Sequence, residues 1–477
     1  MILIRGRATT RRVAAALASG LLAAAAMAVG AAPASAGPST GAGPQPGGAL
    51  ATLDGLRIYD QAIIREGGET TETGAGLFEM SVAGGGSLQS YCIDMHNPTQ
   101  EQARYQEVPW KTSSLHDNPD AGKIRWILQH SYPQVNDLAA LAKASGARHL
   151  TPQTAAAGTQ VAIWRYSDGA DVSAADPNAE KLADHLHEAA RDTAEPKASL
   201  TLDPPAVSGQ PGGRLGPVTV RTGARSAGLT PAPDAAARGV RVVDADGEPV
   251  TSVRNGTQVW FDVPEDTPDG STSVTVETVT PVPVGRAFTG IGENATSQTQ
   301  ILAGSSDATV TATATANWAA SGPVPAVSAQ KNCAAQGLDL TVANQGDEPF
   351  TFTIGEDDHT VAAGETGTVT VPVGEDQAYR ITVEGPGGYQ QTFAGVLDCA
   401  TVSTGTGDAE GEGPSVQTAP VTVGGNTGPV NLAETGGGSD APLLIGVAVG
   451  LLVLGAGAVY MVRSNRGGEP QAASDQE

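Results

Sequence analysis

The residues best suited to covalent chemistry are one thiol and one carboxamide. Cys92 lies in the tetrapeptide YCID, and Gln160 lies in the hexapeptide TQVAIW. A thiolate is both a good nucleophile and a good leaving group, and a glutamine carboxamide that loses ammonia becomes an acyl group. Two side chains held in contact gain an effective molarity on the order of 10⁵ M, which would allow an internal thioester to form. An amine of another molecule could then attack the thioester carbonyl and become covalently attached.

The number of cysteines favours a free thiol at Cys92. The chain has three cysteines, so at least one remains outside any disulfide. Cys333 and Cys399 bracket one β-rich segment and are the natural pair. We therefore expect a Cys333–Cys399 disulfide and a thiol at Cys92 that is available for the thioester.

Two predicted elements position the thiol and the carboxamide. Residues 77–82 and 88–94 are predicted as two strands joined by a glycine triplet, with Cys92 near the end of the second strand. Residues 151–166 are predicted as a helix, with Thr151 as its N-cap. On this helix Gln160, Ile163 and Trp164 share one side, so the carboxamide is expected among large apolar neighbours. Three further residues are candidates for shaping the site: Tyr91, Asp94 and Thr159.

The second half of the chain is predicted to be β-structure. Short strands separated by Pro, Gly and Asp turns begin near residue 199 and indicate an antiparallel sandwich. The sequence leaves open whether these strands form a separate domain or complete the domain that holds Cys92. Alternating apolar residues predict a small immunoglobulin-like sandwich at 326–402, with Pro372 in an edge strand. The expected fold class is multidomain, with a mixed α/β N-terminal domain of antiparallel strands and helices followed by all-β regions.

Both ends of the chain have the features of targeting signals. Residues 1–36 combine arginines, an apolar run and a small-residue cleavage site, as export signals do. The general secretory route is favoured, although adjacent arginines leave the twin-arginine route open. Near the other end, the pentapeptide LAETG precedes an apolar run at 441–462 that is long enough to span a bilayer as a helix. Two arginines follow the run and are expected on the cytoplasmic side.

Charge excludes one class of partner. The formal net charge is −24, and a strongly acidic surface repels phosphate backbones, so a nucleic-acid partner is not expected. Thioester chemistry of this kind requires no metal and no cofactor.

The two motifs together resemble the signature of bacterial thioester domains, which occur at the tips of Gram-positive surface proteins. The TQxA-type motif downstream of the cysteine motif carries the resemblance, which covers about residues 51–192. It implies a thioester between Cys92 and Gln160. It also implies covalent binding of a host or surface protein through an accessible amine, commonly that of a lysine.

The C-terminal elements resemble a sortase sorting signal. Its pentapeptide has alanine where proline is usual, a variant similar to signals of actinobacterial sortases. The resemblance implies a cell-wall adhesin with only a transient membrane helix. Cleavage after Thr435 would link that residue to peptidoglycan. The pentapeptide comprises Leu432, Ala433, Glu434, Thr435 and Gly436.

The expected organisation follows from these segments. The predicted parts are a signal peptide at 1–36, a disordered stretch at 37–50, a thioester domain at 51–198, a β-sandwich or completion of that domain at 199–320, an immunoglobulin-like domain at 326–402, a flexible wall-spanning linker at 403–431, the sorting signal at 432–466 and a cytoplasmic tail at 467–477.

Three alternatives remain open at the level of sequence. Cys92 could be a buried inert thiol and Gln160 an ordinary helix residue. The protein could be a noncovalent adhesin or a structural wall protein whose β domains act as spacers or binding surfaces. It could also be a secreted cysteine hydrolase or transpeptidase, with Cys92 as nucleophile and His130 or His149 as base.

Overall fold

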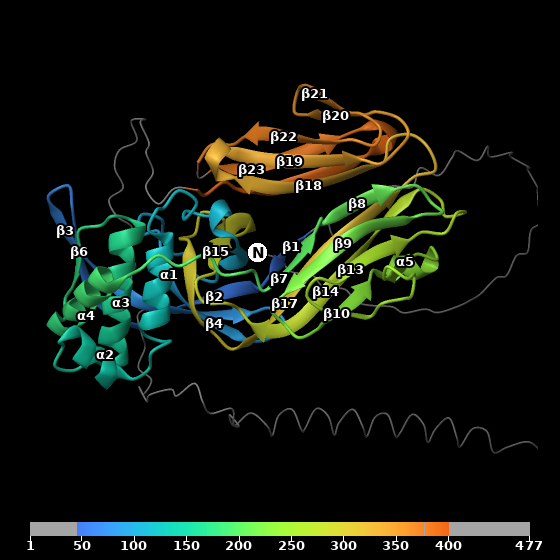
Figure 1. Cartoon of the computed structure of the whole chain (residues 1–477). Coiled ribbons are helices and arrows are strands. Elements are labelled where there is room, and N and C mark those ends of the chain that lie inside the picture. Colours follow the sequence, from blue (N-terminus) through green and yellow to red (C-terminus); the bar gives the residue numbers. More distant parts are fainter. Residues whose placement is uncertain (1–44, 376, 400–477) are drawn as a thin grey trace, which may run out of the picture. The chain divides into compact units, whose positions relative to one another are not determined.

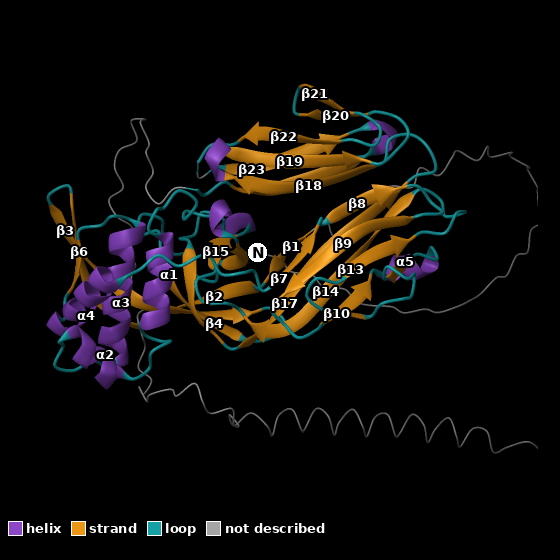
Figure 2. Cartoon of the chain, viewed as in Figure 1, coloured by secondary structure: helices purple, strands orange, loops and turns teal. Residues whose placement is uncertain are grey.

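The computed structural model describes residues 45–375 and 377–399. Four expected segments therefore lie outside the described residues: the export signal, the wall-spanning linker, the sorting signal with its apolar run, and the cytoplasmic tail. Within the described ranges, no helix is both long and apolar enough to cross a membrane. The described part is mostly β-sheet with a few helices (Figure 2).

The sheet that carries Cys92 has seven strands, in the order β3-β4-β16-β15-β5-β2-β6. An additional pairing of β2 with β3 joins six of the strands into a closed ring. The predicted hairpin is confirmed as β3 and β4, which pair antiparallel on either side of the glycine turn. The strands are β2 (Leu50–Glu66), β3 (Glu69–Val82), β4 (Ser87–Cys92), β5 (Arg104–Val108), β6 (Val172–Ala174), β15 (Ala287–Gly290) and β16 (Gln300–Ser305).

The two long strands β2 and β3 are the main difference from the predicted elements of this region. They pair with each other along nearly their whole length, from Ala51 opposite Val82 to Glu66 opposite Glu69. The far end of β3 is rich in Thr and Glu and is largely exposed, so it lacks the alternation of apolar residues that marks a half-buried strand. The pairing of the two strands, not burial, extends β3 beyond the predicted residues.

The helices of this region include the one predicted at 151–166. They are α1 (Ala121–His130), α2 (Leu138–Ser145), α3 (Pro152–Ser167) and α4 (Pro177–Ala189), and they gather at one end of the sheet (Figure 1). Helix α3 begins in a capping box, in which the Thr151 side chain accepts from the Thr154 N–H at 3.2 Å and the Thr154 hydroxyl accepts from the Thr151 N–H at 2.9 Å. The predicted N-cap is thus confirmed.

Small residues allow α3 to be buried on all sides. Every residue from 155 to 164 is buried. A Cβ atom at Gly158 would lie 2.5 Å from the Ala179 carbonyl oxygen of α4, so only glycine permits this approach of the two helices. The close packing fixes the position of α3, and therefore that of Gln160, relative to the sheet.

Residues 199–320 contribute to two structures. Most of their strands form two facing sheets with one apolar core, built from residues such as Val218, Phe261 and Val276. One sheet contains β1 (Gln45–Gly48), β17 (Asp307–Trp318), β14 (Gly270–Pro281), β10 (Ala227–Pro231), β12 (Ser252–Val253) and β8 (Ala206–Gly209), and the other contains β11 (Arg241–Val243), β13 (Gln258–Asp262), β9 (Arg214–Thr222) and β7 (Leu200–Asp203), with the short helix α5 (Pro233–Ala237) between strands.

Two strands from the same segment enter the ring instead. β16 pairs with β4, and β15 pairs with β5 and with β16. At the other end of the described chain, the stretch expected to be disordered is ordered from residue 45, since β1 pairs with β17. Residues 199–320 thus form most of two sandwich sheets and also contribute two strands to the Cys92 sheet.

A buried ion pair ties the ring to the chain that follows α4. The Arg286 Nε atom donates to a Glu107 carboxylate oxygen at 2.9 Å, and the two side chains are 4% and 0% exposed. Arg286 also donates to Glu195 at 2.8 Å. The backbone N–H groups of Ala49 and Ser199 each donate to Glu107 at 3.1 Å. The charge on Glu107 is thus fully compensated in a place that water does not reach.

Residues 325–399 form a further pair of sheets with their own apolar cluster around Leu340, Phe350 and Val383. Pro372 ends the edge strand β22, as predicted. A disulfide joins Cys333, just after β18, to Cys399, just after β24. The strands are β18 (Pro325–Asn332), β19 (Gly337–Asn344), β20 (Phe350–Ile354), β21 (Asp357–Val361), β22 (Thr366–Pro372), β23 (Ala378–Glu384) and β24 (Gln390–Val396).

Candidate functional site

The carboxamide of Gln160 is bonded directly to the backbone of Cys92. The Cys92 N–H donates to Gln160 Oε1 at 3.0 Å, and Gln160 Nε2 donates to the Cys92 carbonyl oxygen at 2.8 Å. Both residues are 0% exposed. Two hydrogen bonds therefore hold the carboxamide beside the residue that carries the only cysteine thiol of the described chain.

The sheet explains why Cys92 has free backbone groups to offer. Pairing of β3 with β4 ends at Phe78 opposite Ser90, and beyond that point β3 pairs only with β2. The N–H and C=O of Cys92 therefore lack a strand partner on that side. The Gln160 side chain supplies one donor and one acceptor in its place, as a continued strand would. A buried strand end is thus satisfied by the side chain that the proposed chemistry requires.

The sulfur of Cys92 also accepts hydrogen bonds from neighbouring residues. Sγ accepts from the indole Nε1 of Trp164 at 3.5 Å and from the Asp94 N–H at 3.4 Å. Trp164 follows Gln160 by four residues on α3, so one face of the helix contacts both the backbone and the sulfur of Cys92. Burial raises the pKa of the Cys92 thiol well above its usual value, and the charge of Asp168 raises that pKa further. The site therefore favours an uncharged sulfur, as a thiol or as a thioester.

Asp168 extends the same helical face by one more turn, and sequence reasoning took it only as the end of the helix. Its Oδ1 accepts from the Met95 N–H at 3.0 Å, and its Oδ2 accepts from the Ser167 hydroxyl at 2.6 Å. Gln160, Trp164 and Asp168 follow one another at intervals of four residues, and all three form hydrogen bonds with the segment from Cys92 to Met95. This spacing was the signal that could have identified Asp168 from the sequence.

We expect Asp168 to make stability depend on pH. Burial raises the pKa of Asp168 from 3.8 to about 6. The folded state therefore binds this proton more tightly than the unfolded state, so the contribution of Asp168 to stability is largest at acid pH and falls as pH rises from about 4 to about 6. Relative to Asp168→Asn, the free energy of unfolding of the wild type should fall by about 2–3 kcal/mol between pH 4 and pH 7.

Urea unfolding at a series of pH values measures this difference. The matched control is Asp171→Asn, since the Asp171 side chain is 72% exposed. Curves for wild type and Asp168→Asn that run parallel across the range would contradict the assignment.

The other predicted site residues are all buried. Asp94 is buried, and its carboxylate accepts from Asn97 Nδ2 at 2.5 Å. The Tyr91 hydroxyl donates to the Tyr132 carbonyl oxygen at 2.8 Å, and the Thr159 hydroxyl donates to the Ala155 carbonyl oxygen at 2.8 Å. Ile163 is buried in the same apolar core. The Trp164 indole and the Asp94 N–H thus contact the sulfur, whereas the hydroxyls of Tyr91 and Thr159 bond to carbonyl groups elsewhere.

The histidines considered as bases for a hydrolase do not join this site. His130 and His149 are exposed, whereas Cys92 is fully buried. The His130 ring stacks on Trp126, and its Nδ1 lies 2.8 Å from the Trp126 carbonyl oxygen. Neither histidine is therefore placed to act as a base for Cys92.

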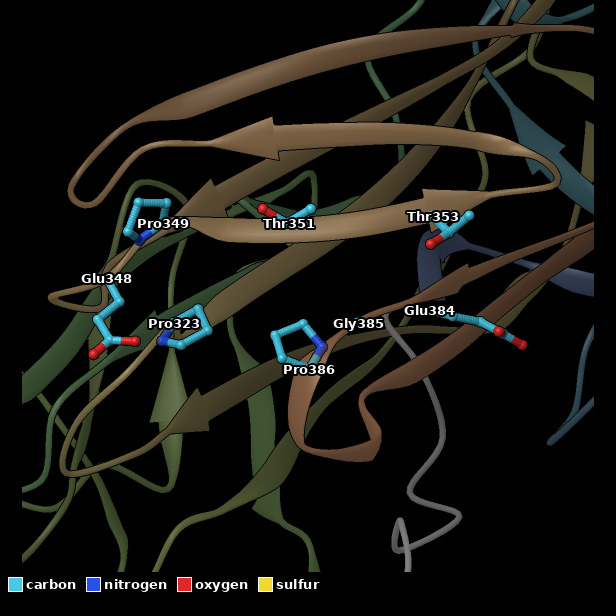
Figure 3. Close-up of a pocket in the computed structure, with 8 residues that line it drawn as sticks. All are labelled: Pro323, Glu348, Pro349, Thr351, Thr353, Glu384, Gly385 and Pro386. Carbon is cyan, nitrogen blue, oxygen red and sulfur yellow. The ribbon is translucent and has the colours of Figure 1, made fainter.

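A separate open pocket of about 460 Å³ lies in the β unit that follows residue 320 (Figure 3). Its walls come from β20, the end of β23 and the loops beside these strands, and they carry prolines, threonines and two glutamates, among them Thr351, Glu384 and Pro386. These side chains include no thiol, histidine or lysine, so the pocket does not supply the chemistry considered above.

Comparison with known families agrees with the site geometry. Residues 89–192 match the family model described as the thioester domain, a segment that includes both Cys92 and Gln160. Residues 325–396 match the family model described as the C-terminal domain of bacterial phospholipase C. These findings support a thioester-domain protein with additional β domains. No curated protein matches the chain significantly.

Two solved structures are similar over much of their length. The Bacillus anthracis TIE protein is 15% identical, with 74% of this chain and 81% of that chain covered and a TM-score of 0.26. The thioester domain of the Enterococcus faecium TIE86 protein is 17% identical, with 59% of this chain and 100% of that chain covered and a TM-score of 0.27.

Proposed function

We propose that the protein captures an amine of a target protein covalently, through an internal thioester between Cys92 and Gln160. The observation that carries this proposal is the pair of hydrogen bonds, 3.0 Å and 2.8 Å long, between the Gln160 carboxamide and the Cys92 backbone. They hold the carboxamide beside the backbone of the residue that carries the thiol. Such positioning is the main requirement for a reaction between two otherwise weakly reactive groups.

The thioester forms by exchange of ammonia for sulfur. Cys92 Sγ attacks the carboxamide carbon of Gln160, the C–N bond breaks, and the nitrogen leaves as ammonia with the thiol proton. The Cys92 N–H already donates to Gln160 Oε1, so it is placed to stabilise negative charge on this oxygen during the attack. The product carries no charge, which suits a site that is sealed from water.

In the capture step, nitrogen is the nucleophile and the Cys92 sulfur is the leaving group. An amine nitrogen of the target attacks the Gln160 carbonyl carbon, the C–S bond breaks, and the sulfur takes up the proton that the amine loses. An amide remains on Gln160 and a thiol on Cys92. The protein acts once and is not regenerated, so we do not regard it as an enzyme. Because both residues are 0% exposed, the target must first displace the side chains that cover them.

We further propose that the protein is a surface adhesin of a Gram-positive, actinobacterial cell. Sortase would cleave after Thr435 and join this residue to peptidoglycan, and the target amine would be a lysine of a host or neighbouring-cell protein. Support comes from the order of the export signal, thioester domain, β domains and LAETG pentapeptide along the sequence.

Reaction with methylamine tests the capture step. Incubation of the protein with methylamine should add one methylamine to Gln160, identified in the peptide that contains it. The same treatment should make Cys92 available to alkylation after unfolding. An unchanged mass, together with a Cys92 thiol that is already alkylated without methylamine, would favour a noncovalent adhesin or a structural wall protein instead.

A further inference from the structure

Gln300 is the direct cross-strand neighbour of Cys92. The register of β16 on β4 places the two residues opposite each other. The N–H and C=O of Cys92 both bond to Gln160, and the bond between the strands is instead made by the Ile93 N–H to the Thr299 carbonyl oxygen at 3.1 Å. Cys92 and Gln300 therefore form a non-hydrogen-bonded pair, in which side chains project to the same face and approach most closely.

The Gln300 carboxamide is fixed at one end only. Ser90 precedes Cys92 by two residues and shares its face of β4, and its hydroxyl donates to Gln300 Oε1 at 3.0 Å. This bond uses the carbonyl end of the amide. Nε2 is buried, and within the described chain it has no hydrogen-bond partner. Gln300 as a whole is 0% exposed.

Buried amide donors are almost always bonded in folded proteins, so an unpartnered one calls for an explanation. A fixed donor in a site without water is most useful where negative charge appears during a reaction. Such charge appears on Cys92 sulfur when the C–S bond breaks. The sulfur already accepts from the Trp164 indole at 3.5 Å and from the Asp94 N–H at 3.4 Å, which are ordinary distances for a sulfur acceptor. Gln300 would add a third donor from the neighbouring strand.

We propose that Gln300 is a further residue of the thioester site, and that its Nε2 donates a hydrogen bond to the Cys92 sulfur as the C–S bond breaks. This proposal rests on the proposed function. In the step, the amine attacks the Gln160 carbonyl carbon, the electrons of the C–S bond pass to the sulfur, and the proton lost by the amine then neutralises it. Gln300 forms no covalent bond and gives up no proton. It lowers the energy of the sulfur leaving group between bond cleavage and protonation.

The test measures the rate of methylamine addition to the whole protein by intact mass. Gln300→Met keeps the length of the side chain and removes both donors, and Gln300→Glu keeps an acceptor for Ser90 and replaces the donor end by a second oxygen. We expect both variants to react about tenfold to a hundredfold more slowly than the wild type. The matched control, Gln89→Met on the same β4 strand, should react at the wild-type rate.

A second readout separates charge stabilisation from a packing effect. After complete reaction with methylamine, the freed Cys92 thiol of Gln300→Met should be alkylated by iodoacetamide more slowly than that of the wild type at the same pH. The loss of a donor leaves less thiolate, whereas a loosened site would speed alkylation. Thermal unfolding checks that each variant is folded. If Gln300→Met does not fold, the reaction rate of Gln300→Glu is the test of the proposal.

The outcomes distinguish this proposal from the proposed function. Variants that form the thioester and react within twofold of the wild type would overturn the role of Gln300 and leave the capture function standing. A wild-type protein with no thioester would overturn both.

Discussion

Replacing Gln160 with alanine is expected to abolish covalent capture completely, because the acyl group of the thioester is removed. Cys92→Ala should have the same effect on capture, since the nucleophile is lost. Each variant should keep the full mass of its sequence and gain nothing from methylamine. The matched control is Gln153→Ala, which removes an exposed glutamine from the same helix and should react like the wild type.

The two variants should differ in stability. Both lose a crosslink between positions separated by 68 residues, which by analogy with a disulfide is worth about 4 kcal/mol of the free energy of unfolding. Cys92→Ala keeps the bonds of Gln160 to the backbone of residue 92. Gln160→Ala also leaves that N–H and C=O buried without partners, which should cost roughly a further 1–3 kcal/mol. Urea unfolding measures both values. Equal stability of Gln160→Ala and Cys92→Ala would contradict the role assigned to these bonds.

A fragment of residues 45–198 is expected not to fold, although it contains Cys92, Gln160 and all four helices α1–α4. It lacks β15 and β16, which pair with β5 and β4 in the closed ring. It also lacks Arg286, the buried partner of Glu107. An unpaired buried charge alone costs about 3–5 kcal/mol, and a whole domain is typically stable by only about 5–15 kcal/mol.

The matched fragment of residues 45–320 restores both strands and the arginine, and it should fold and form the thioester. Circular dichroism and amide exchange report folding, and intact mass reports the thioester. A cooperatively folded 45–198 fragment that loses ammonia would show that β15 and β16 are dispensable for folding and for the thioester. That result would contradict the prediction.

Local patterns made part of the site predictable. The hairpin that ends at Cys92 follows from a glycine triplet between apolar stretches, and the N-cap at Thr151 fixed the start of α3 and hence the side on which Gln160 and Trp164 lie. Because Trp164 shares that side of the helix with Gln160, its contact with the sulfur was also predictable. Asp168 was missed because it was interpreted only as the end of the helix. Its spacing of four residues from Trp164 was therefore not considered.

The remainder depends on pairing between distant segments. Nothing near Gln300 marks it as the neighbour of Cys92, since the two meet only through the register of β16 on β4. The same holds for Glu107 and Arg286, which are 179 residues apart. The bonding of Gln160 to the backbone of Cys92 arises because β3 leaves β4 two residues before the strand ends, and this divergence has no local sequence signal.

The central claim, that Cys92 and Gln160 are joined, is tested most directly by the mass of the wild-type protein before any amine or reductant is added. The account predicts a mass below that of the sequence by one ammonia, after allowance for the two hydrogens lost in the Cys333–Cys399 disulfide. It also predicts a peptide in which Cys92 and Gln160 are crosslinked. A protein that retains the ammonia and whose Cys92 thiol is fully alkylated after unfolding would contradict it.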